Sequence, residues 1–382
     1  MRVPDPKPAT TATNAPRAVA ECAASIAALQ LDALLSGSRE PVDREVRLTA
    51  APWGLLETRL PRDPTCRGLH APWAVERADP ELTLRELLAH CGAGPGAQLR
   101  VFGSEWIPTL RCSACREETP VWRTTKSVLA EPRCARCGAR LALRSFDLRS
   151  AIPLADLPPH VVNRRLREFG WGLRETISVE SASATFHYEL STTSTARGAD
   201  HGIVLIAGLG AVGSAAVPLV AATAGVRCVV LVDLDVYEAS NLGHQAISPD
   251  AVGQPKVAYQ AARLRELRPD LDVVPIDRRL EEAPLGLYRD AVVVGCVDSR
   301  VARLELTERA SRVARFQIDV GIDGPTRQAR VQCFEPGHDR ACVLCGWTDV
   351  DFDQLELVMP CDAARSAPRE EDGEWIRSSS AI

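Results

Sequence analysis

The sequence predicts an α/β protein, with a doubly wound and mostly parallel sheet in one domain and a zinc ribbon in a second, smaller domain. The first observation is that apolar runs of strand length alternate with helical patterns between residues 203 and 320, which is typical of such a sheet. The second is a glycine-rich turn directly after one of these runs. The third is a pair of Cys-x-x-Cys motifs elsewhere in the chain.

The glycine-rich turn follows an apolar run at residues 203–206. Gly208, Gly210 and Gly213 have the G-x-G-x-x-G spacing and lead into a helix of small residues expected at 215–224. The first two glycines permit a tight turn and a close approach of backbone to a phosphate, and the third lets the helix pack on the strand. Free N–H groups at the helix N-terminus favour an anion. By itself this pattern is most common in NAD(P) dehydrogenases.

The alternation continues beyond the turn. An apolar run at 228–232 ends in Asp233, about 20 residues on, where an acidic side chain can bind ribose hydroxyls. The apolar pattern then predicts a helix at 254–267, strands at 273–276 and 291–297, a helix at 301–313, a strand at 316–320 and an antiparallel extension at 327–334.

A zinc ribbon is predicted by two cysteine pairs, Cys112 with Cys115 and Cys134 with Cys137. Each pair has the spacing of a metal-binding turn. Arginines nearby are offset by glutamates, so a structural role is favoured over contact with nucleic acid. After the ribbon we expect one helix that includes residues 161–169, and then strands at 174–179 and 185–190.

Composition limits the classes of function. The chain has 382 residues, 46% of them hydrophobic, which is enough for one large domain and a smaller one. A net charge of -5 argues against a general nucleic-acid surface. We expect no apolar run of membrane-span length and no signal peptide, and therefore no membrane partner and a cytoplasmic location. Thirteen cysteines then indicate metal ligands, and a possible nucleophile, before disulfides.

The sequence predicts that the N-terminal region, residues 16–70, is folded and forms part of a domain. Residues 16–35 have apolar side chains at helical spacing, and residues 44–60 alternate like two paired strands. The segment Asp63-Pro64-Thr65-Cys66 follows, with His70 just beyond it.

The motifs after the glycine turn carry a resemblance to a known family. They are Ser-Asn-Leu-Gly-His-Gln at 240–245, Val-Gly-Gln-Pro-Lys at 252–256, Asp298 after a strand, Asp-Val-Gly-Ile-Asp-Gly at 319–324, and Cys342 with Cys345. In this order they resemble the E1-like adenylyltransferases, which include ubiquitin-activating enzymes and the ThiF- and MoeB-type activators of sulfur-carrier proteins. The match runs from about residue 202 to residue 361 and implies the Rossmann-like ThiF/E1 adenylation fold.

The resemblance also implies a circularly permuted order. In the family a helix, two strands and a D-P-x-C-x-x-C motif follow the first Cys-x-x-Cys, whereas here they precede the glycine turn. Residues 16–70 would then complete the domain begun at residue 202, and Cys66 and His70 would join Cys342 and Cys345 as zinc ligands. Leu69 stands where the family has a cysteine, so the fourth ligand stays open. The alternative is a separate N-terminal helical domain.

These inferences give a domain plan. It consists of a disordered tail (1–15), the permuted C-terminal part of the adenylation domain (16–70), a small zinc-ribbon domain (71–190), a linker (191–201), the nucleotide-binding part (202–364) and a flexible tail (365–382).

The chemistry that the resemblance implies is ATP-dependent activation of a carboxylate, with Mg²⁺ and Zn²⁺ as metals. Lys256 would neutralise phosphate and Asp298 would hold Mg²⁺. The nucleotide-binding residues implied are Gly208, Gly210, Gly213, Asp233, Asp235, Asn241, His244, Gln245, Lys256 and Asp298.

Two positions decide how much of that chemistry this chain retains. His244 stands where the family has arginine, so the phosphate site is weaker or is helped by Arg303 or Arg197. Cys361 is either an acyl- or sulfur-accepting nucleophile, which would need a lowered pKa, or a loop cysteine, or the open zinc ligand. With Asp298 and Lys256, Arg303 and Cys361 complete the candidate catalytic set.

Three functions fit the sequence. The first is an E1-like adenylyltransferase, expected as a homodimer, that acts on a ubiquitin-like protein, a sulfur-carrier protein or a peptide. The second is a non-catalytic relative that binds a partner or a leader peptide. The third is a Rossmann oxidoreductase.

Overall fold

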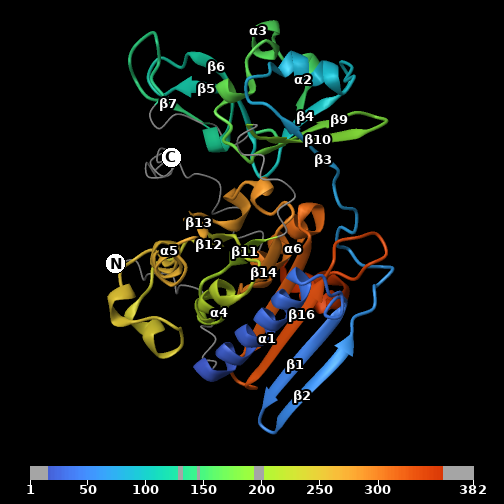
Figure 1. Ribbon diagram of the computed structural model, residues 1–382. Coiled ribbons are helices and arrows are strands. Elements are labelled where there is room, and N and C mark those ends of the chain that lie inside the picture. The colour runs from blue at the N-terminus through green and yellow to red at the C-terminus, as the bar shows by residue number, and fades with distance from the viewer. Residues whose placement is uncertain (1–15, 128–131, 144–146, 193–201, 356–382) are drawn as a thin grey trace. The chain divides into compact units, whose positions relative to one another are not determined.

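The computed structural model describes residues 16–127, 132–143, 147–192 and 202–355. Two compact units are present in the chain. The first contains residues 1–72, 199–283 and 288–348, and the second contains residues 73–198, 284–287 and 349–382. Figure 1 shows the labelled elements of both.

The first unit is built on an eight-stranded sheet with the order β13-β12-β11-β14-β15-β16-β1-β2. The five strands from β13 to β15 are parallel, and β16, β1 and β2 extend the sheet in antiparallel fashion. The predicted parallel sheet with an antiparallel extension is therefore confirmed. The strands are β11 (Ile203–Ala207), β12 (Cys228–Val232), β13 (Asp272–Ile276), β14 (Val292–Gly295), β15 (Phe316–Asp323), β16 (Gln328–Phe334), β1 (Arg44–Ala50) and β2 (Trp53–Arg59).

Three helices connect the parallel strands: α4 (Ala211–Ala222), α5 (Lys256–Leu267) and α6 (Arg300–Val313). Strands β12 and β14 are buried along their whole length, which explains their continuous Val-rich sequence. Helix α4 begins four residues earlier than predicted, because Gly210 is its N-cap. The glycine turn therefore opens directly into the helix.

The N-terminal segment belongs to this same sheet. Helix α1 (Arg17–Leu35) packs on α4, β15 and β16 (Figure 1), and its buried residues are part of the unit's main hydrophobic core. Strand β1 pairs antiparallel with β16, so that Val46 lies opposite Val331. The alternative of a separate N-terminal helical domain is wrong. A circularly permuted origin of this order stays a prediction.

Helix α1 corrects one expectation. By length and composition alone, Arg17–Leu35 could cross a membrane, although no such run was expected. Eight of its residues are buried, among them Ala20, Leu31 and Leu34. Burial in the core accounts for the apolar character of the helix.

The second unit contains two smaller sheets. One has the order β3-β10-β9-β4-β8 and the other β6-β5-β7, and Trp106, Phe169 and Trp171 pack together beside them. Helix α2 (Leu84–His90) begins with a capping box at Thr83. The strands are β3 (Val75–Ala78), β4 (Gln98–Val101), β5 (Trp106–Cys112), β6 (Glu118–Thr124), β7 (Leu141–Ala142), β8 (Ile152–Pro153), β9 (Thr176–Glu180) and β10 (Thr185–Leu190).

The single helix expected through residues 161–169 is wrong. Helix α3 ends at Val162, and a separate 3₁₀ turn spans Leu166–Phe169. The chain turns between them and Arg165 is extended, because the backbone N–H of Leu166 donates to the carbonyl of Leu82 at 2.8 Å and the carbonyl of Arg164 accepts from the N–H of Leu84 at 3.0 Å. Tertiary hydrogen bonds here override the helical spacing of the apolar residues.

Candidate functional site

A cavity of about 840 Å³ opens at the carboxyl ends of the parallel strands of the first unit, where open α/β sheets bind their ligands. Its walls come from the turns after β11, β12, β13 and β14 and from the last residues of β15. All the predicted nucleotide-binding residues except Gly213 line the cavity, and so does Arg303. They are Gly208, Gly210, Asp233, Asp235, Asn241, His244, Gln245, Lys256 and Asp298.

The glycine turn has the geometry that the spacing predicts. Gly208 has a φ of +85°, and a Cβ there would lie 2.8 Å from the carbonyl oxygen of Cys296. At Gly213 a Cβ would lie 2.0 Å from the carbonyl oxygen of Gly208, so α4 packs directly on the turn. Nothing lies within 4 Å of the corresponding position at Gly210, which leaves its backbone open toward the cavity.

Asp233, Asp235 and Lys256 form a charged group at the end of β12. Nζ of Lys256 lies 2.8 Å from Oδ2 of Asp235 and 4.0 Å from Oδ2 of Asp233. Asp233 also accepts from the backbone N–H of Leu209 at 2.6 Å, which ties it to the glycine turn. Burial raises the pKa of Asp233, although Lys256 opposes this shift. Lys256 is itself buried, so it is not a solvated surface lysine.

The segment after Asp235 forms a 3₁₀ turn, Ala239–Gly243, against the cavity. Asn241 accepts from the backbone N–H of Glu238 at 2.9 Å, which fixes its side chain. Its amide NH₂ group donates to no residue that the structure describes, so it can donate to a ligand. His244 and Gln245 follow directly, half-buried, in the cavity wall.

Asp298 follows β14, and Arg303 lies in the first turn of α6. Asp298 is exposed and lines the cavity. Arg303 is buried and pairs with Asp319, and it donates to the carbonyl oxygen of Val297 at 2.8 Å. Its charge is neutralised within the protein. The structure therefore argues against Arg303 as the arginine that replaces the charge missing at His244.

Sequence reasoning missed several residues of this site. Arg278, Arg279 and Leu280 line the cavity just after β13, and their position after a parallel strand was the signal that could have found them. The hydroxyl of the buried Tyr237 donates to the carbonyl oxygen of Leu209 at 2.9 Å, and this hydrogen bond stabilises the glycine turn. No sequence pattern pointed to that contact.

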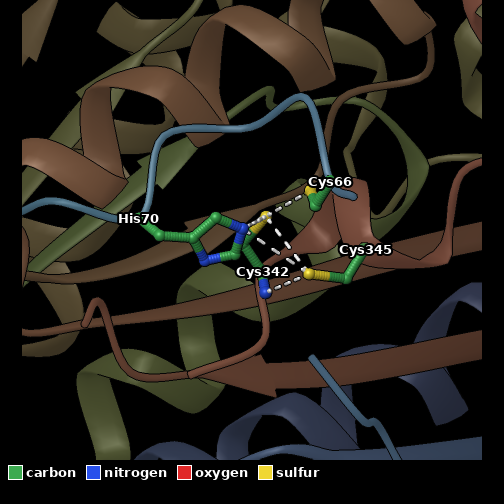
Figure 2. Close-up of side chains that lie close together, drawn as sticks. All are labelled: Cys66, His70, Cys342 and Cys345. Carbon is green, nitrogen blue, oxygen red and sulfur yellow. Dashed lines mark hydrogen bonds between the residues drawn. The ribbon is translucent and has the colours of Figure 1, made fainter. Parts of the chain in front are cut away.

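A second candidate site in the first unit, the three-cysteine cluster, consists of Cys66, His70, Cys342 and Cys345. Figure 2 shows the three thiols and the imidazole converging on one point. Sγ of Cys342 lies 3.8 Å from Sγ of Cys66, 3.9 Å from Sγ of Cys345 and 3.7 Å from Nε2 of His70. All four ligand atoms lie within 4.8 Å of one another.

These distances fit a tetrahedral zinc ion. With zinc bonds of about 2.3 Å to sulfur and about 2.0 Å to nitrogen, tetrahedral ligands stand roughly 3.5–3.8 Å apart. Nδ1 of His70 lies 3.0 Å from the carbonyl oxygen of Arg340, so this nitrogen can donate there and leave Nε2 free for the metal. His70 therefore completes the ligand set that was left open at Leu69.

The four-cysteine cluster in the second unit consists of Cys112, Cys115, Cys134 and Cys137. Sγ of Cys137 lies 3.4 Å from that of Cys112 and 3.5 Å from that of Cys115, and Sγ of Cys115 lies 3.6 Å from that of Cys134. The two knuckles thus converge as a zinc ribbon requires. Cys361 and Arg197 lie outside the described residues.

Residues 197–366 match the model of the ThiF family. The chain is 32% identical over 149 residues to the sulfur carrier protein ThiS adenylyltransferase of Escherichia coli, covering 38% of this chain and 58% of that protein. It is 37% identical over 106 residues to the molybdopterin-synthase adenylyltransferase of Escherichia coli, covering 27% of this chain and 42% of that protein.

A third relative is archaeal. The chain is 41% identical over 145 residues to the SAMP-activating enzyme E1 of Haloferax volcanii, covering 37% of this chain and 52% of that protein. The chain thus spans about half the length of the curated relatives it matches.

Proposed function

We propose that the chain, which carries a ThiF family domain over residues 197–366, is an ATP-dependent adenylyltransferase of the E1-like type. One observation carries the proposal. The glycine turn, Asp233, Lys256 and Asp298 come from four separate parts of the sequence, and all contribute to the wall or floor of one cavity. This arrangement favours a nucleoside triphosphate over a dinucleotide such as NAD. The buried Lys256 can neutralise additional phosphate charge, and the exposed Asp298 can bind the metal ion that accompanies a triphosphate.

The reaction joins a carboxylate to AMP. A carboxylate oxygen of the substrate attacks the α-phosphorus of ATP, the bond from that phosphorus to the bridging oxygen of the β-phosphate breaks, and pyrophosphate leaves with the electron pair. The products are an acyl-adenylate and pyrophosphate. Such a step depends mostly on positioning and on neutralising phosphate charge.

Each cavity residue has a place in this scheme. The open backbone at Gly210 and the N-terminus of α4 would bind phosphate oxygens. Asp233 would accept hydrogen bonds from the ribose, as acidic residues at this strand end do. Lys256 would exchange its contact with Asp235 for one with phosphate. Asp298 would hold Mg²⁺, which supplies additional neutralisation of phosphate charge when it is bound.

The acyl substrate is proposed to be the C-terminal carboxylate of a ubiquitin-like protein, a sulfur-carrier protein or a peptide. The names of the relatives support this class. Cys361 would accept the acyl group or handle sulfur in a following step, and a homodimer would be the active form.

The two cysteine clusters are proposed to hold structural zinc. Each offers four ligands with no open position, which is the pattern of structural rather than catalytic sites. The three-cysteine cluster would also fasten residues 66–70 to residues 342–345. That link would join the N-terminal segment to the nucleotide-binding part in the permuted order.

ATP–pyrophosphate exchange tests the proposal. A pull-down with ATP, followed by mass spectrometry, would identify a partner that carries AMP on its C-terminus, and that partner should then stimulate exchange. If ATP binds but no carboxylate substrate supports exchange, the chain is the non-catalytic relative that His244 suggests. Reductase turnover with NAD(P) would overturn the proposal altogether.

A further inference from the structure

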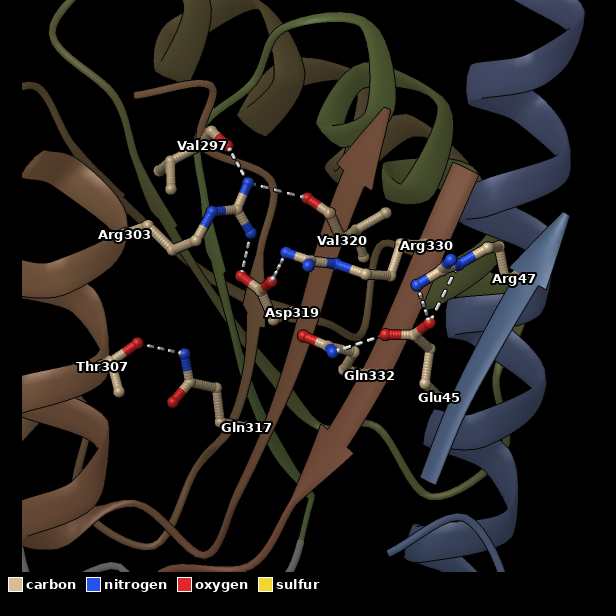
Figure 3. A network of polar contacts seen from close by, with 10 residues as sticks. All are labelled: Glu45, Arg47, Val297, Arg303, Thr307, Gln317, Asp319, Val320, Arg330 and Gln332. Atoms are coloured by element: carbon tan, nitrogen blue, oxygen red, sulfur yellow. Dashed lines mark hydrogen bonds and ion pairs between the residues drawn. The ribbon is translucent and has the colours of Figure 1, made fainter. Parts of the chain in front are cut away.

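The β15 end of the cavity carries charged side chains that the proposed function leaves unused. Figure 3 shows the guanidinium groups of Arg303 and Arg330 on opposite sides of the Asp319 carboxylate. Arg303 pairs with one carboxylate oxygen of Asp319, which is fully buried. Nη2 of Arg330 lies 3.8 Å from the other oxygen, which is beyond hydrogen-bonding distance. That oxygen accepts no hydrogen bond from any residue the structure describes.

The neighbouring strand offers Arg330 no closer carboxylate among the described residues. Arg47 on β1 stands opposite Arg330 in the sheet, and it donates to Glu45 at 2.7 and 3.0 Å. Glu45 also accepts from Gln332 at 2.7 Å. Three guanidinium groups therefore share two carboxylates, and Arg330 is the one without a carboxylate within hydrogen-bonding distance.

Arg330 does not itself line the cavity, and Gly321, which has no side chain, lies between the two. Gly321 lines the cavity and stands opposite Arg330 in the β15–β16 register. A Cβ at Gly321 would lie 3.9 Å from Nη2 and 4.0 Å from Nε of Arg330, so any larger side chain would fill the space between the guanidinium and the cavity. The Arg330 side chain is 36% exposed.

The order of the strands identifies the ligand. Phosphates would lie at the glycine turn after β11, and the ribose would lie at Asp233 after β12, so the nucleoside extends toward β13. Strands β14 and β15 lie on the other side of β11. The group that approaches the α-phosphate from that side is the acyl substrate, and its charged end is a carboxylate.

We propose that Arg330 binds the carboxylate of the substrate that is to be activated, an inference that rests on the proposed function. A planar guanidinium binds both oxygens of a carboxylate, which fixes its orientation as well as its position. The carboxylate of Asp319 attracts the Arg330 guanidinium at 3.8 Å. At this distance it does not occupy the N–H donors of Arg330. The proposal names no specific protein, only a free carboxylate that enters past Gly321.

The test measures binding of acetyl-glycyl-glycine, and of its C-terminal amide, to the full chain in the presence of Mg²⁺ and α,β-methylene-ATP by NMR titration. The wild type is expected to prefer the carboxylate to the amide by at least tenfold. Arg330→Ala is expected to lose this preference, and Arg330→Lys to retain part of it. Arg47→Ala is the matched control, since Arg47 lies on the same face of the sheet and is 48% exposed, and it is expected to keep the preference.

Three results would overturn the proposal: no preference in the wild type, an unchanged preference in Arg330→Ala, or an equal loss in Arg47→Ala. Weaker binding of α,β-methylene-ATP to Arg330→Ala would overturn it too, by making Arg330 a phosphate ligand. If the wild type binds no nucleotide, the proposed function fails. The peptide titration of the nucleotide-free protein would still decide whether Arg330 binds a carboxylate.

Discussion

Replacing Gly213 by alanine should separate the fold of the glycine turn from its proposed ligand contacts. A Cβ at this position would lie 2.0 Å from the carbonyl oxygen and 3.0 Å from the carbonyl carbon of Gly208. The obstacle is backbone, so rotation of a side chain cannot relieve it. Helix α4 would have to move away from β11 by about 1 Å, and overpacking of this kind costs about 3 kcal/mol or more.

The expected effect is measurable by thermal unfolding. For a domain of this size a loss of about 3 kcal/mol lowers Tm by roughly 6–12 °C. Gly210→Ala is the matched control, because nothing lies within 4 Å of a Cβ there and φ is −73°. Gly210→Ala should cost no more than about 1 kcal/mol of stability, the usual effect of alanine at an N-cap, and should therefore lower Tm much less than Gly213→Ala. It should also weaken ATP binding, because it places a methyl group in the cavity. Equal Tm values for wild type and Gly213→Ala would refute the packing argument.

Three further predictions concern the cavity and the clusters. Asp298→Ala should abolish pyrophosphate exchange while Tm stays unchanged, since Asp298 is exposed; retained exchange would remove it from the Mg²⁺ role. Elemental analysis should find two zinc ions per chain, one for each cluster, and His70→Ala should lower the count to one; a wild-type count of one would confine zinc to the four-cysteine cluster. Cys296 is half-buried and lines the cavity, and desolvation raises the pKa of its thiol to about 12; it should therefore resist iodoacetamide at pH 8, and labelling in the native protein, detected by mass spectrometry, would contradict the raised pKa.

Much of the nucleotide-binding half could be predicted because its signals are local. The three glycines have a fixed spacing, each strand is a short apolar run, and the acidic residues follow the strands directly. Backbone geometry at a turn and burial of a strand depend on neighbours in the sequence, so the pattern predicts them. The helix predicted through residues 161–169 failed for the opposite reason, since hydrogen bonds to the distant backbone groups of Leu82 and Leu84 interrupt it between Val162 and Leu166.

The sequence pattern could not predict which charged side chains form ion pairs within the protein and which remain able to bind a ligand. Arg303 and Lys256 look alike in sequence as cations after motif residues, yet Arg303 pairs with the fully buried Asp319 on β15, whereas Lys256 pairs with the exposed Asp235 after β12. Whether an ionised group is free to bind a ligand depends on atoms within about 4 Å, and those atoms come from residues far apart in the chain.

By itself, the sequence determined the α/β class, the glycine turn, the two cysteine pairs of the ribbon and the order of the E1-like motifs. Only the tertiary structure decided that His70 lies beside Cys342, that β1 pairs with β16, and that Arg330 lies 3.8 Å from Asp319, beyond hydrogen-bonding distance. These contacts join segments from distant parts of the chain. Their formation depends on how the packed core brings the segments together, and local propensity carries no information about that.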